Sequence, residues 1–127
     1  MSRTIVTTDG APAAIGPYSQ GVVADGRFLF VSGQLPIVPQ TGNLLEGPIE
    51  DQAGQVFKNL DAIAAAAGAT LADAVKTTVF LTDMTDFTTV NQVYADYFKE
   101  PYPARSAFQV AALPLGAAIE VEAVFRV

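Results

Sequence analysis

The side chain best suited to hold a small acidic molecule is Arg105, in the segment PYPARSAFQV of residues 101–110. It follows a loop with two prolines and opens a predicted strand. Its planar guanidinium presents a fork of N–H groups that matches the two oxygens of a carboxylate. Ala107 points to the same side of the strand and leaves room beside the guanidinium. Arg105 is therefore either a carboxylate clamp or a solvated residue at a strand end.

Glu120 is the second candidate, because the sequence has no histidine and no cysteine that could take a catalytic role. That absence excludes Ser–His and Cys–His mechanisms, thiolate chemistry and histidine-bound zinc. A carboxylate can act as a general acid/base or orient a water molecule. The alternative is that Glu120 and Glu122 simply form the polar face of a half-buried strand.

Four further residues could line the same site. Tyr18 follows a Gly-Pro pair in a rigid turn, which fixes the direction of its side chain. Either its hydroxyl reaches a ligand, or its ring only packs against the protein. Ser32 and Gly33 end an apolar strand, where a backbone N–H can stay free for a ligand; alternatively, Ser32 is a strand-end serine whose hydrogen bonds are satisfied within the chain. Asn91, in a predicted helix, either caps a loop or faces a pocket. No Walker or dinucleotide-binding motif is present, and we expect no metal ion or organic cofactor.

The composition predicts one soluble domain covering residues 1–127. Half of the residues are apolar, which is enough for a core, and the net charge is −6. An acidic surface repels phosphate backbones, so we expect no nucleic-acid partner. No apolar run reaches the roughly 18 residues of a membrane helix, and no signal peptide is visible. We therefore expect no membrane association and a cytoplasmic location.

Hydrophobic periodicity predicts the order β-β-α-β-α-β-β, an α+β fold. Two strands are expected around a tight Asp25-Gly26 turn, followed by a loop. The remaining predicted elements are a helix over 49–67, a strand over 74–82, a helix over 86–98, a short strand from Arg105 and a strand over 118–127.

Several predicted strands are apolar on both faces, although two helices can cover only one face of a sheet. Phe28 and Phe30 oppose Leu29 and Val31 in this way. The second face therefore needs a cover that one chain does not supply, and a homo-oligomer is the simplest source.

Together, these segments resemble the reactive intermediate deaminase (Rid, or YjgF-like) family almost from end to end. The resemblance is carried by APAAIGPYSQG, FVSGQLP, GATLADAVKTTVFLTDMTDFTTVNQVYADYF, YPARSAF and IEVEAV. It implies a chorismate-mutase-like fold: a mixed sheet of roughly six strands with two helices on one face. It also implies a homotrimer whose sheets line a central barrel, with sites between subunits.

The resemblance further implies hydrolysis of 2-imino and 2-enamino acids, such as 2-aminoacrylate, to 2-oxo acids and ammonia. Arg105 matches the family's carboxylate-binding arginine, and Glu120 matches the residue that positions the hydrolytic water. Tyr18, Ser32 and Gly33 match pocket-lining positions, and Asn91 matches a nearby polar one.

One departure from the family pattern is Ala107, where many members carry cysteine. Because that position acts mainly through its backbone amide, hydrolysis should be spared, although substrate preference could shift. Two other functions remain open at this point. One is a sensor or chaperone-like protein that binds small acids in the Arg105 pocket without turnover. The other is a ribonuclease or translation inhibitor.

Overall fold

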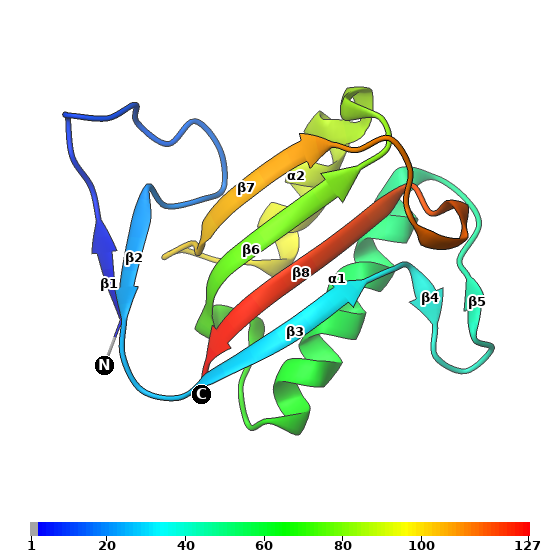
Figure 1. The fold of residues 1–127 in the computed structure, drawn as a ribbon, viewed down its shortest axis with the longest axis horizontal. Coiled ribbons are helices and arrows are strands. Elements are labelled where there is room, and N and C mark those ends of the chain that lie inside the picture. Colours follow the sequence, from blue (N-terminus) through cyan, green and yellow to red (C-terminus); the bar gives the residue numbers. More distant parts are fainter. Residues whose placement is uncertain (1–2) are drawn as a thin grey trace.

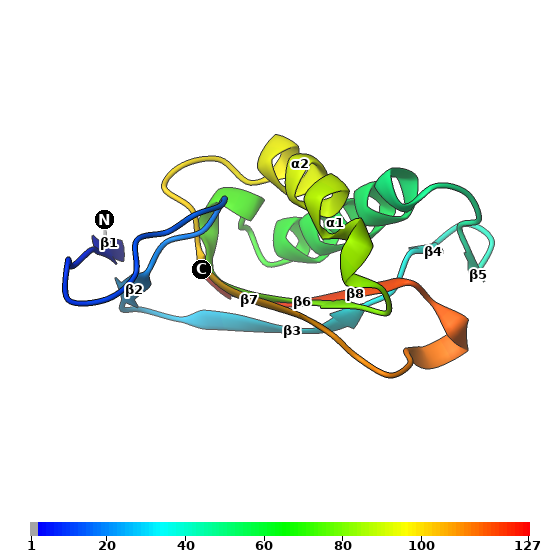
Figure 2. The same ribbon diagram turned by 90° about the horizontal axis from the view of Figure 1, so that it is seen from above.

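The computed structural model describes residues 3–127, in which two helices lie on one face of a four-stranded sheet (Figures 1 and 2). The strands are β1 (Arg3–Val6), β2 (Gly21–Ala24), β3 (Phe28–Gln34), β4 (Ile37–Val38), β5 (Asn43–Leu44), β6 (Ala74–Leu81), β7 (Ala104–Gln109) and β8 (Ile119–Arg126). The helices are α1 (Ile49–Ala66) and α2 (Phe87–Tyr97). None of the helices in this part of the chain is long and apolar enough to cross a membrane.

The main sheet has the strand order β3-β8-β6-β7 and is mixed. β8 runs antiparallel to both of its neighbours, whereas β6 and β7 are parallel. Parallel neighbours need a crossover connection, and α2 supplies it by leading from the end of β6 back to the start of β7. This crossover places α2 over the strand that carries Arg105.

Helix α1 begins and ends where the local sequence predicts. Pro48 is its N-cap residue, and Glu50 and Asp51 lie in its first turn, where negative charge opposes the helix dipole. The backbone at Gly68 has φ +78°, a left-handed conformation that glycine adopts at little cost after a helix. The apolar stripe of α1 faces the sheet and buries Val56 and Leu60 completely.

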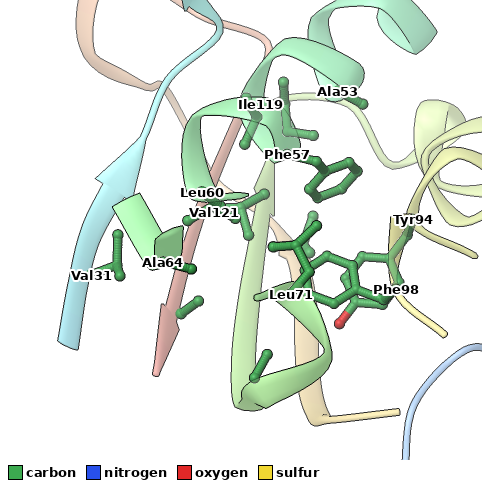
Figure 3. Packing of buried hydrophobic residues seen from close by; sticks show 14 of the residues in the cluster. Val31, Ala53, Phe57, Leu60, Ala64, Leu71, Tyr94, Phe98, Ile119 and Val121 are labelled. Carbon is green, nitrogen blue, oxygen red and sulfur yellow. The ribbon is translucent and has the colours of Figure 1, made fainter. Parts of the chain in front are cut away.

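The core between helices and sheet is built around three aromatic rings (Figure 3). Phe57 of α1 meets Tyr94 and Phe98 edge-on, each at 5.6 Å between ring centroids, and Tyr94 stacks on Phe98 at 4.3 Å. Strand β8 contributes alternate residues from Ile119 to Phe125, as its sequence pattern predicts. The rigid core therefore includes Tyr94, a residue that also reaches the Arg105 side chain.

The predicted pairing of two strands around Asp25-Gly26 is wrong. Both strands exist, but β2 pairs with β1 and β3 pairs with β8. Gly26 has φ +112°, whereas Asp25 does not have the positive φ that a type I′ turn demands. The Asp-Gly pair is thus a bend between two separate sheets.

Two other expectations need correction. The main sheet has four strands rather than roughly six, because β1 and β2 form a separate ribbon. Strand β1 was not predicted. The segment of residues 35–48, expected to be a loop, contains the short antiparallel pair β4 and β5. Two-residue strands carry too little periodicity to be recognised in a sequence.

The sheet face opposite the helices is bare within one chain, as predicted (Figure 2). Three exposed phenylalanines project from it. Phe30 is 76% exposed, and Phe28 and Phe108 are 39% and 44% exposed. Exposed aromatic side chains in a contiguous sheet face are typical of a surface that another chain covers.

Candidate functional site

Arg105 is the second residue of β7, and its side chain faces α2. Its partner in the parallel pairing with β6 is Thr77, which is fully buried. The guanidinium Nη1 donates a hydrogen bond of 2.7 Å to Oδ1 of Asn91 in α2. Asn91 therefore contacts Arg105 and faces the pocket described below.

Three aromatic rings surround the guanidinium. Its central carbon lies 4.9 Å from the ring centroid of Tyr94, and 5.4 Å from those of Tyr18 and Phe87. Aromatic faces attract a cation at such distances and restrict where it can move. Burial lowers the pKa of Arg105 from its usual value, but an arginine stays protonated in proteins. The result is a fixed, partly desolvated cation.

Tyr94 connects this cation to the core. Its hydroxyl shares a 2.7 Å hydrogen bond with Oγ1 of Thr77, and both residues are fully buried. Burial raises the pKa of Tyr94 to about 12, so the ring stays neutral at physiological pH. The Tyr94 ring that contacts Arg105 is therefore held in place by the hydrogen bond of its hydroxyl to Thr77.

This raised pKa predicts a loss of stability in alkali. Between pH 10 and about 12 the unfolded tyrosine loses its proton while folded Tyr94 keeps it, so the free energy of unfolding falls as the pH rises. The stabilisation from neutral, buried Tyr94 is fully present below pH 10. Between pH 9 and pH 11 the free energy of unfolding should fall by about 1 kcal/mol. Urea denaturation at both pH values should show it. Tyr94→Phe should flatten this dependence, and parallel pH profiles for the two proteins would contradict the prediction.

A pocket of about 300 Å³ opens beside the guanidinium. It is lined by Ile15, Gly16, Tyr18, Phe87, Asn91, Arg105 and Ala107. A Cβ added to Gly16 would lie 3.5 Å from Nη2 of Arg105, so this glycine leaves that nitrogen open to the pocket. Of the five N–H groups of a guanidinium, the Asn91 contact uses one. The others leave room for a bidentate contact with a carboxylate.

The loop that carries Tyr18 is held by local hydrogen bonds. The backbone N–H of Ile15 donates to the Tyr18 hydroxyl at 3.2 Å, and the N–H of Tyr18 donates to the Gly16 carbonyl at 2.8 Å. Gln20 braces the loop further through bonds with the backbone of Thr8 and Pro12. The Tyr18 ring therefore packs on Arg105, and its hydroxyl serves the loop.

Glu120, Gly33 and Ser32 form a second cluster on other strands. Glu120 lies between the buried residues Ile119 and Val121 on β8, so its side chain points away from the helices. Gly33 lies directly under that side chain, in the irregular part of the β3–β8 pairing. Glu120 is half-buried and Ser32 is exposed.

The two clusters do not meet within one chain. Arg105 faces the helix layer, whereas Glu120 faces the bare side of the sheet, and β6 separates their strands. The structure thus brings Tyr18, Asn91, Arg105 and Ala107 together, and places Ser32, Gly33 and Glu120 elsewhere. A single chain therefore holds the predicted site residues in two separate clusters.

The sequence alone does not reveal that Phe87 and Tyr94 lie beside Arg105, because aromatic residues at this spacing are typical of a helix stripe that packs on the core. Their spacing from Asn91 contained the signal. Phe87, Asn91 and Tyr94 follow each other at intervals of four and three residues, so they share one face of α2. Asn91 is thus a polar residue on an otherwise apolar helix face, which is the feature that distinguishes this point of the stripe.

A larger hollow, of about 750 Å³, lies on another side of Tyr18. Its lining includes Asp9 and Glu100 and no arginine or lysine, so it offers no cation for an acidic ligand. Despite its size, it is a poorer candidate site than the pocket at Arg105. Within residues 3–127, no three His, Cys, Asp or Glu side chains are grouped so that they could hold a metal ion.

Comparison with known proteins links this geometry to one family. Residues 8–127 match the family profile described as Endoribonuclease L-PSP. The human protein 2-iminobutanoate/2-iminopropanoate deaminase is 50% identical over 124 residues, which are 98% of this chain and 90% of that protein. Reactive Intermediate Deaminase A from the chloroplast of Arabidopsis thaliana is 49% identical, and the match covers 98% of this chain and 66% of that protein.

Solved structures agree with these matches. RidA from the Antarctic bacterium Psychrobacter sp. PAMC 21119 superposes with a TM-score of 0.77 at 48% identity, covering 98% of this chain and 99% of the other. E. coli TdcF with bound serine superposes with a TM-score of 0.75 at 45% identity, covering 98% of both chains.

Proposed function

This chain belongs to the L-PSP endoribonuclease family, also called the YjgF or Rid family, and we propose that it is a hydrolase that deaminates 2-imino and 2-enamino acids. Relatives of about 50% identity that are named 2-iminobutanoate/2-iminopropanoate deaminase support the reaction class. The structural observation that carries the proposal is Arg105, fixed by Asn91 and three rings beside an open pocket.

The proposed reaction needs only water and side chains of this protein. An enamine such as 2-aminoacrylate takes a proton on its terminal carbon and becomes 2-iminopropanoate. Water adds to the carbon of the C=N bond, one of its protons passes to nitrogen, and a carbinolamine forms. The C–N bond then breaks as the hydroxyl loses its proton, which leaves a 2-oxo acid and ammonia. An iminium carbon is already electrophilic, so positioning supplies much of the gain.

Arg105 has the role of an anchor in this proposal. Its free N–H groups grip the substrate carboxylate, which sets the imine carbon beside the pocket wall formed by Ala107 and Phe87. Serine, bound in the related E. coli TdcF, carries the same kind of carboxylate. Because Ala107 contributes only a methyl group, this wall leaves space for the substrate side chain.

Glu120 has the role of a base that orients water and passes its proton to nitrogen. It lies on the opposite sheet face from Arg105, so we propose that the working site takes these two residues from different subunits. A homotrimer that closes the bare sheet faces on one another would cover Phe30 and Phe108. We propose that this trimer acts in the cytoplasm.

A coupled assay tests the proposed function. A dehydratase generates 2-aminoacrylate, and the formation of 2-oxo acid is followed with and without the protein. We expect acceleration by the wild type and a much smaller acceleration by Arg105→Ala. A wild type that binds pyruvate but does not accelerate the reaction would overturn the deaminase proposal and leave a sensor that binds small acids.

The family name also suggests cleavage of RNA, against which the net charge of −6 argues. The same two proteins should be incubated with RNA. Cleavage by the wild type that disappears in Arg105→Ala would favour a ribonuclease, whereas equal cleavage by both would indicate a contaminant.

A further inference from the structure

Gly33 and Glu120 fit against each other closely. A Cβ added to Gly33 would overlap Oε2 of Glu120 and would lie 2.7 Å from its Cδ and 3.0 Å from its Cγ. These three atoms make up most of the glutamate side chain, so the side chain lies across the bare Cα of residue 33. Any residue with a Cβ at this position would occupy the same space.

The backbone does not explain why residue 33 is glycine. Its φ lies outside the left-handed region, unlike those of Gly26 and Gly68, so an alanine could adopt the same conformation. The need for glycine at this position therefore comes from the space above its Cα, and that space is filled by Glu120.

The pairing of β3 with β8 shifts between Val31 and Gln34, and such a bulge bends the strand and redirects it. In a regular strand Gly33 would share the helix-facing side of Val31, whereas the extra residue turns it toward Glu120 on the opposite face.

We propose that Gly33 is a positioning residue for Glu120. Because residue 33 has no side chain, the Glu120 carboxylate can lie over its Cα on the bare face of the β3–β8 pair. We expect this to be the position from which the carboxylate acts on the substrate. This inference rests on the proposed function, because it assigns Glu120 the task of orienting water. It adds a specific cause for the position of that carboxylate, namely the space left by the missing side chain of residue 33.

The test is Gly33→Ala, because the atoms that overlap with the new methyl group belong to a flexible side chain that can swing away. We expect kcat to fall about tenfold, KM to change less than twofold, and the melting temperature to stay within about 2 °C of the wild type. In a Glu120→Gln background, the same change should cost almost nothing more, since the two residues act as one unit.

Gly21→Ala is the matched control. It also places a methyl group on a strand glycine, but that group meets only the Cβ of Val6, at an ordinary 3.5 Å. It should leave kcat unchanged. Full activity in Gly33→Ala, or a loss that simply adds to that of Glu120→Gln, would overturn the proposal.

Crystal structures of the wild type and Gly33→Ala provide a readout that is independent of activity. The Glu120 carboxylate should move away from residue 33 in the variant. A carboxylate that stays in place would overturn the positioning role of Gly33, even if the protein proved to be no deaminase. Should Gly33→Ala fail to fold, Gly33→Ala/Glu120→Ala should restore folding by removing the overlapping atoms. Failure of both variants would overturn the proposal too.

Discussion

Arg105→Ala is expected to lower kcat/KM for 2-iminopropanoate by about 30- to 1,000-fold, which corresponds to about 2–4 kcal/mol of lost transition-state stabilisation. This is the scale of a broken charge-assisted pair in a partly desolvated site. The half-buried guanidinium is fixed by Asn91 and three aromatic rings. The pocket lining contains no other arginine or lysine that could replace it.

Arg105→Lys separates the loss of charge from the loss of shape. Lysine keeps the charge but cannot form a two-pronged contact with a carboxylate while also donating to Asn91, so it should recover only part of the activity. Pyruvate should raise the melting temperature of the wild type and not that of Arg105→Ala. If Arg105→Ala turned over imino acids like the wild type, Arg105 would be a solvated strand end.

Much of the fold could be predicted because the long elements carry strong periodic patterns. The helix at 49–67 and the strand at 118–127 show their apolar faces plainly, and the structure confirms both, with helix bounds of Ile49–Ala66. The pairing of strands was harder to infer. Asp25-Gly26 suggested a hairpin, but β3 instead buries Val31 beside β8, a contact between residues far apart in the sequence.

The candidate site was predictable as a set of residues and not as an arrangement. Residue types and the family resemblance singled out Arg105 and Glu120, but the register of their strands against β6 decides that they occupy opposite sheet faces. The rings of Phe87 and Tyr94 are typical core residues in a helix pattern, so their contact with a cation emerged only when β7 was placed beneath α2. Tertiary neighbours decided these roles.

Glu120→Gln is expected to lower kcat by about 100-fold or more while binding of a 2-oxo acid changes little. Glutamine keeps the shape of the side chain and fills the same space over Gly33, but it cannot accept a proton from water. Steady-state kinetics with the coupled dehydratase assay would separate kcat from KM, and calorimetric titration with pyruvate would report binding.

Glu122→Gln is the matched control, because Glu122 lies two residues away on the same strand and the same sheet face. Glu122 is exposed and lines a pocket with Phe30 and Lys76. Unlike Glu120, it does not lie over Gly33. Its loss should change kcat less than threefold. Equal losses for both variants would mean that the effect comes from the strand and not from a base.

Mixing the two inactive variants tests whether Arg105 and Glu120 work across a subunit boundary. Light scattering should first give a mass of about 40 kDa, three times the 13.3 kDa of one chain. Arg105→Ala and Glu120→Gln chains refolded together should then regain activity, since random assembly gives about a quarter of the sites one intact copy of each residue. If both residues of a site came from the same chain, the mixture would stay as inactive as its components. A stable monomer would rule out the shared site, because Glu120 and Arg105 lie on opposite faces of the sheet in a single chain.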